Sequence, residues 1–191
     1  MAKTETKALH PSTWNKERLK AILRGKLGKK VLVIGDVGVD RYTIGVVERI
    51  SPEAPVPIVL VTSEQFKLGL AANVADNIKV LGGVPLLVGI VGQDRSATDF
   101  RQLLKGAGVG SSHLIVDRSR RTVLKDRVVS DRQQLLRVDF ESPHPIAREV
   151  EKSVLDKIEA LLPQVDAVII EDYAKGLLSE RLSSGGRSSS L

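Results

Sequence analysis

A short, unbroken apolar run at residues 31–34 (Val-Leu-Val-Ile) leads directly into Gly35 and Asp36. A run of this kind indicates a strand buried on both faces, as in a parallel sheet that helices cover on two sides. Residues 85–91 and 165–170 have the same character. Helices must therefore cover both faces of the sheet, because its strands have no face that suits contact with solvent.

Helical patterns fall between these strands. Residues 71–81 and 146–162 place apolar side chains at helical spacing, and Asp94 or Ser96 can cap a further helix that runs through Leu104. Alternation of strands and helices predicts a doubly wound α/β fold with a mostly parallel sheet. In such sheets, ligands bind beyond the carboxyl ends of the strands.

A proline-rich stretch separates the first strand from the first of these helices. Prolines at positions 52, 55 and 57 interrupt a β-rich segment of about residues 43–62. Because proline lacks a ladder donor, this segment does not suit a central strand, and we expect a small β flap or lid. Residues 122–130 and 134–139 are also β-rich and predict a second hairpin.

The composition of the chain argues against several classes of binding partner. The net charge of +6 is scattered and aromatics make up only 3%, which does not fit a nucleic-acid interface. The absence of cysteine excludes disulfides and thiolate metal sites. No run approaches the ~20 apolar residues of a membrane span, and the N-terminus has no apolar leader. We expect a cytoplasmic protein with a small-molecule ligand.

The two ends of the chain differ from the middle. Residues 1–28 are polar and basic, and Ser12 or Thr13 can begin one amphipathic helix that packs on the domain as an extension. Residues 183–191 are rich in serine and glycine and are expected to be disordered. Residues 29–182 form the predicted α/β domain.

Asp36 and Asp40 follow the first strand, where a ligand is expected to lie. Carboxylates accept hydrogen bonds from hydroxyl groups, so the pair suits a polyol or a sugar. For Asp36, capping of the local turn is an equally good interpretation. Gly69 and Asn73 stand where a helix opens, and they fit either a sugar contact or a plain helix start.

Asp172 and Lys175 follow the last predicted strand. An aspartate and a lysine at that edge could serve a metal-bound phosphate. An ordinary turn from strand to helix is the alternative interpretation.

In this order, the motifs resemble the ribokinase (PfkB) family of sugar kinases, above all its heptose-7-phosphate kinase branch. The resemblance covers residues 30–182. The matching stretches are 35–37 with 40–42, 49–57, 71–75, 133–139 and 172–176.

The resemblance implies a ribokinase-like fold and ATP-dependent, Mg²⁺-assisted phosphorylation of heptose 7-phosphate at its anomeric hydroxyl. That reaction belongs to the synthesis of ADP-heptose for lipopolysaccharide. Asp40, Gly69 and Asn73 would then hold sugar hydroxyls, and Arg137 and Asp139 would shape the pocket.

The resemblance also assigns the phosphate side and the lid. Lys175 would face phosphate and Asp172 would lie near the metal without ligating it directly. The lid residues Arg49, Ser51, Pro52 and Glu53 would close over the sugar, and the lid would pair with a second subunit.

Two departures from the family pattern stand out. Leu70 occupies the place of the second of two adjacent glycines. The family's later Gly-Ala-Gly-Asp segment, whose Asp is the catalytic base, does not occur in this sequence. We therefore expect the C-terminal part of the fold to be missing and the fragment to be inactive alone. The alternatives are a non-catalytic module for sugar-phosphate binding or dimerisation, and another sugar kinase of the family.

Overall fold

A computed structural model describes residues 15–25, 27–131, 133–142 and 144–178. The predicted helix start at Ser12 or Thr13 and the tail of residues 183–191 lie outside these ranges. Within the described part of the chain, no helix is long and apolar enough to cross a membrane.

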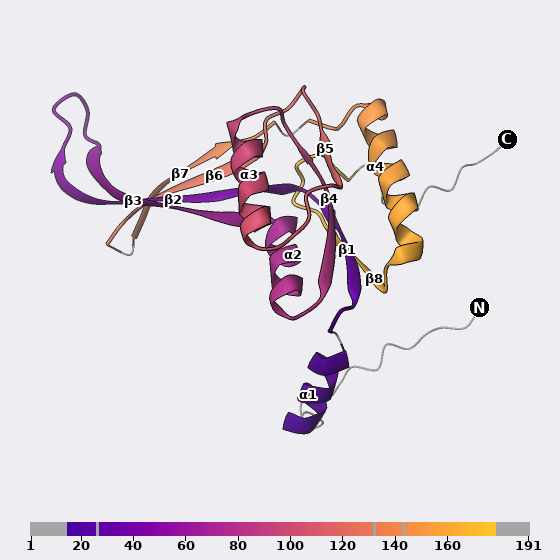
Figure 1. Ribbon diagram of the computed structural model, residues 1–191. Helices are drawn as coiled ribbons and strands as arrows, with labels where there is room; N and C mark the ends of the chain where they lie inside the picture. Colours follow the sequence, from indigo (N-terminus) through magenta and orange to yellow (C-terminus); the bar gives the residue numbers. More distant parts are fainter. Residues whose placement is uncertain (1–14, 26, 132, 143, 179–191) are drawn as a thin grey trace, which may run out of the picture.

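The central sheet has four parallel strands in the order β5-β4-β1-β8 (Figure 1). They are β1 (Lys30–Gly35), β4 (Val84–Val91), β5 (Leu114–Val116) and β8 (Ala167–Glu171). The apolar run that begins this sheet is fully buried at Leu32 and Val33, as predicted. The predicted parallel sheet is confirmed.

Helices cover both faces of this sheet. Val33 faces a core built with α2 (Ala71–Val80) and α3 (Arg95–Gly106), whereas Leu32 and Ile34 face α4 (Arg148–Leu161). This follows from the two-residue period of a strand, which sends neighbouring side chains to opposite faces. The doubly wound α/β architecture is thus observed.

The predicted helix boundaries rest on the expected caps. Asp94 caps α3 by accepting a hydrogen bond from the Ala97 backbone N–H at 2.8 Å. After α2, Gly82 has a φ of +84°, a left-handed conformation that glycine adopts without steric cost. A short 3₁₀ turn, η2 (Leu162–Gln164), carries the proline after α4.

The lid is much longer than the predicted segment of residues 43–62. Strands β2 (Val37–Ile50) and β3 (Pro57–Leu70) have 14 residues each. They form a second sheet with β6 (Val123–Ser130) and β7 (Gln133–Phe140), in the order β3-β2-β6-β7. The prolines do not interrupt pairing, because Pro57 is the first residue of its strand and the others lie in the turn. The predicted hairpin of β6 and β7 is confirmed.

The prediction that residues 165–170 form a fully buried strand is wrong. Strand β8 lies at the edge of the sheet, and Val168 and Ile170 are 42% and 57% exposed. These two side chains lie on the α4 side of the sheet, but α4 packs over β4 and β5.

The N-terminal helix exists but does not pack as expected. It is α1 (Lys16–Gly25), and it lies apart from both sheets in Figure 1. Its apolar side chains Leu19 and Ile22 remain exposed.

Candidate sugar-binding site

The lid sheet carries one strongly polar face. Its strand registers place Asp40 beside Lys67 and Lys125, and the next row outward contains Tyr42 and Arg127. Paired residues on neighbouring strands point to the same face, so these side chains gather on one surface.

An ion pair orients Asp40 on this face. Arg127 donates a hydrogen bond from Nη1 to Asp40 Oδ1. This hydrogen bond is the largest cause of a raised pKa at Arg127. The guanidinium also lies 5.4 Å from the centroid of the Tyr42 ring. Asp40 is therefore held in a fixed direction opposite a permanent cation.

Gly69 leaves the space that this carboxylate occupies. A Cβ at position 69 would stand 3.0 Å from Asp40 Oδ2 and 3.3 Å from the Gly38 carbonyl oxygen. Any larger residue would push the carboxylate aside. The structure thus brings Gly69 and Asp40 together, as the sequence predicts.

Asp40 and Asn73 line the same cavity, which has a volume of about 430 Å³. Asn73 stands in the first turn of α2, and its amide has no hydrogen-bond partner among the described residues. The lining residues are Asp40, Tyr42, Phe66, Lys67, Leu68, Asn73, Asp76, Leu103 and Ala107. This cavity offers carboxylate acceptors, an amide and an ammonium group, which is the set that a charged sugar requires.

Leu70 adopts a backbone conformation that suits glycine. Its φ is 58° and its ψ is −138°, and its side chain is buried. This region is nearly closed to residues that carry a Cβ. The departure from the family's glycine pair therefore places backbone strain directly beside Gly69.

Asp36 has a different role from the predicted sugar contact. Its carboxylate is 5% exposed and accepts backbone hydrogen bonds from Tyr173, Lys175 and Leu177, at 3.0, 3.0 and 3.3 Å. The alternative interpretation, in which Asp36 caps its own local turn, is not seen in these hydrogen bonds, because all three donors lie 137 or more residues away in the chain. The turn that it holds is the distant loop after β8.

That loop is fixed from several sides. Lys175 donates a hydrogen bond from Nζ to Glu141 Oε1 at 2.9 Å. Its ammonium group is therefore already paired with a carboxylate. Arg120, which pairs with Asp117 at 3.1 Å, donates to the Lys175 carbonyl at 3.1 Å. Asp172 is exposed, and its Oδ1 accepts from the Ala174 backbone N–H at 2.8 Å. The expected contacts of Lys175 and Asp172 with phosphate and metal stay predictions.

The remaining predicted residues lie farther out on the lid. Arg137 and Asp139 bond to each other at 2.9 and 3.1 Å, and neither lines the cavity. The turn with Arg49, Ser51, Pro52 and Glu53 forms the far tip of the β2–β3 ribbon in Figure 1. Their predicted contacts with sugar are not tested by this arrangement.

The site residues predicted from the sequence do not include Lys67, Lys125 and Arg127, which share the polar face with Asp40. Lys125 lies over the Tyr173 ring, 5.8 Å from its centroid, and so joins the lid to the loop after β8. Burial, followed by the Glu171 carboxylate, raises the pKa of Tyr173. The signal available was the two-residue spacing of Lys125 and Arg127, which places both on one face of a strand.

Comparison with known proteins agrees with this geometry. A profile of the pfkB family carbohydrate kinases matches residues 28–183. A relative named bifunctional protein HldE from Helicobacter pylori (strain J99) is 43% identical over 155 residues, which cover 81% of this chain and 34% of the relative. The HldE of Pseudomonas paraeruginosa (strain PA7) is 49% identical over 148 residues, or 78% and 30% of the two chains. The chain thus spans about a third of the length of these curated relatives.

Solved structures show the same fold. A carbohydrate kinase from Agrobacterium tumefaciens superposes with a TM-score of 0.53 at 19% identity, over 74% of this chain and 45% of that one. A microbiome-derived acarbose kinase has a TM-score of 0.50 at 22% identity, over 75% and 45%.

Proposed function

The chain belongs to the pfkB family of carbohydrate kinases, and on that premise we propose that it forms the sugar-binding part of an ATP-dependent heptose-phosphate kinase. The acceptor would be the anomeric hydroxyl of a heptose 7-phosphate, in the synthesis of ADP-heptose. The relatives named HldE, at 41–49% identity, support the heptose branch of the family. A cytoplasmic location, where ATP is available, is part of the same proposal.

The oriented carboxylate of Asp40 is the observation that carries this proposal. Arg127 fixes its Oδ1, while Oδ2 lies beside Gly69. A carboxylate held in this way can accept hydrogen bonds from two neighbouring sugar hydroxyls without first losing rotational freedom. Asn73, across the cavity, can donate to one hydroxyl and accept from another.

The charge of the lid face favours a sugar that carries a phosphate. Arg127 is paired with Asp40, and Arg137 is paired with Asp139. Among the described residues, no carboxylate pairs with Lys67 or Lys125, each of which lies over a tyrosine ring. Two cations without a counterion beside the cavity match the charge of a phosphate dianion.

The described residues do not assemble a magnesium site. No group of three or more His, Asp or Glu side chains in the described ranges is close enough to hold a metal ion. Asp172 is a single exposed carboxylate. We therefore assign no role in the reaction to a magnesium ion held by these residues. We propose that this chain alone binds the sugar phosphate without phosphorylating it.

Calorimetry with heptose 7-phosphate tests the proposal. We expect the chain to bind it, and we expect Asp40→Asn to weaken binding at least tenfold, because the amide loses an acceptor and the pair with Arg127. Asp99→Asn, at a half-buried position on α3 that does not line the cavity, is the matched control and should bind within twofold of the wild type. Equal affinity in both variants, or absence of binding to the wild-type chain, would refute the site.

A second measurement separates the phosphate from the sugar. Lys125→Gln should weaken binding of heptose 7-phosphate while leaving the weaker binding of unphosphorylated heptose unchanged. An ATP turnover assay with the wild-type chain should show no stimulation by either sugar. Stimulated turnover would contradict the proposed inactivity.

We also propose that the lid pairs with a second copy of the chain. The lid face opposite Asp40 exposes Leu136 and Val138, which are 55% and 36% exposed. Exposed apolar side chains gathered on one face are typical of protein interfaces. Sedimentation should show a dimer that Leu136→Asp converts to a monomer, and a monomeric wild-type chain would rule the interface out.

A further inference from the structure

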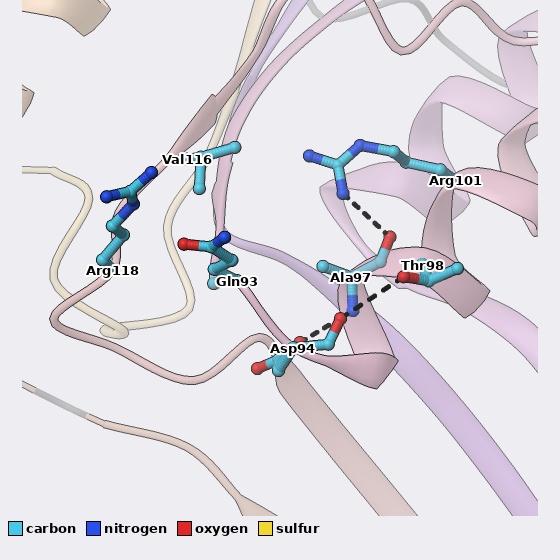
Figure 2. A pocket seen from close by; sticks show the side chains of 8 residues that line it. Gln93, Asp94, Ala97, Thr98, Arg101, Val116 and Arg118 are labelled. Atoms are coloured by element: carbon cyan, nitrogen blue, oxygen red, sulfur yellow. Dashed lines mark hydrogen bonds between the residues drawn. The ribbon is translucent and has the colours of Figure 1, made fainter.

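A second cavity, of about 640 Å³, lies at the carboxyl end of β4, away from the sugar cavity. Its walls come from the start of α3 and from the segment after β5 (Figure 2). Arg101 stands on one side, and Gln93, Val116 and Arg118 face it from the other. The cavity has the size of a small-molecule site.

Its two arginines have no carboxylate partner among the described residues. Arg101 makes one hydrogen bond, from Nη1 to the Ala97 carbonyl at 3.3 Å, and its other donors are free. Arg118 makes no hydrogen bond within the described chain. By contrast, five other arginines (Arg41, Arg95, Arg120, Arg127 and Arg137) are each paired with an aspartate.

The one carboxylate in the wall does not neutralise them. Asp94 Oδ1 accepts from the Ala97 backbone N–H, and Oδ2 accepts from the Thr122 backbone N–H, both at 2.8 Å. Both oxygens are thus committed to holding the start of α3 against the start of β6. The Gln93 amide has no hydrogen-bond partner in the described chain and adds a neutral donor.

We propose that this cavity is a binding site for a small phosphorylated molecule, held between the guanidinium groups of Arg101 and Arg118. Two planar forks on opposite walls can each donate paired hydrogen bonds to phosphate oxygens, which an ammonium group cannot do. Ala97 and Val116 provide apolar contacts for the rest of the ligand. The site is separate from the cavity at Asp40, because the two share no lining residue.

The test is a titration of the full 191-residue chain with inorganic phosphate, followed by the backbone amide signals in NMR spectra at constant ionic strength. We expect the amides of Gln93, Thr98 and Arg118 to shift together and to define one dissociation constant. The double variant Arg101→Gln with Arg118→Gln should raise that constant at least fivefold.

Two controls keep the result specific. Arg95→Gln removes an arginine from the same helix that is exposed and paired with Asp99, and it should change the constant less than twofold. The double variant Arg101→Lys with Arg118→Lys retains the charge and should lose affinity by an intermediate factor. Shifts confined to Lys125 and its neighbours, or an unchanged constant in the glutamine variant, would overturn the proposal.

Discussion

The two sheets of this molecule are stabilised in opposite ways. The central sheet has helices on both faces and a core in which Leu32, Phe100 and Leu104 are fully buried. The outer lid sheet has no covering layer in the described chain, and its strands are joined by backbone pairing with two ion pairs between β2 and β6. The candidate sugar residues Asp40 and Arg127 lie on this second sheet. The polar groups proposed for sugar recognition are thus concentrated in the sheet that has the smaller buried area.

Two phenylalanines give the largest expected contrast between the sheets. Phe100 is fully buried, whereas Phe66 on the lid is 40% exposed. We expect Phe100→Ala to lower the free energy of unfolding by about 3–5 kcal/mol, and Phe66→Ala by about 1 kcal/mol or less. Urea denaturation measures both. Similar losses in the two variants would show that the lid has a core of its own.

The two ion pairs between β2 and β6 should separate stability from binding. Asp126 accepts from Arg41 at 2.6 Å and from Thr43 at 2.9 Å, on the face opposite Asp40. We expect Asp126→Asn to cost about 1–3 kcal/mol of stability, because it leaves a part-buried arginine without its partner. Its affinity for heptose 7-phosphate should change little.

On the polar face of the lid, the variant to compare with Asp126→Asn is Arg127→Gln. It should cost less stability than Asp126→Asn, but it should weaken binding of heptose 7-phosphate more than tenfold because Asp40 is no longer oriented. Calorimetry and urea denaturation on both variants provide the comparison. A larger loss of affinity in Asp126→Asn would reverse the assignment of the two faces.

The smallest expected effect concerns the strained position at the base of the lid. Alanine is normally more stable than glycine inside regular structure, by about 0.5–1 kcal/mol. At Leu70, with a φ of 58°, the order should be reversed, because glycine alone relieves the backbone strain. Leu70→Gly should therefore unfold at a higher temperature than Leu70→Ala. The usual order would show that the strain is negligible.

The central sheet could be predicted from the sequence because its strands are apolar on both faces, its helices place apolar residues at helical spacing, and Asp94 caps α3. The lid was underestimated because β2 and β3 alternate polar and apolar residues without a uniform signal, and their prolines looked like interruptions. The sequence points to Asp40, Gly69 and Asn73 because motifs mark them, and their contacts with a sugar stay predictions. Arg127 and Lys125 were missed because only the pairing of β6 with β2 brings them to Asp40. Asp36 could not be distinguished from Asp40, because the loop that it holds lies 137 or more residues away in the chain.

The β2–β3 ribbon of the lid joins the central domain through single residues. Asp36 alone separates β1 from β2, and Leu70 passes directly into α2. A 14-residue strand is roughly 45 Å long at the usual rise. At the base of this ribbon, Asp36 also accepts hydrogen bonds from the loop after β8. A rotation of a few degrees about Asp36 and Leu70 would displace the β2–β3 tip by several ångströms.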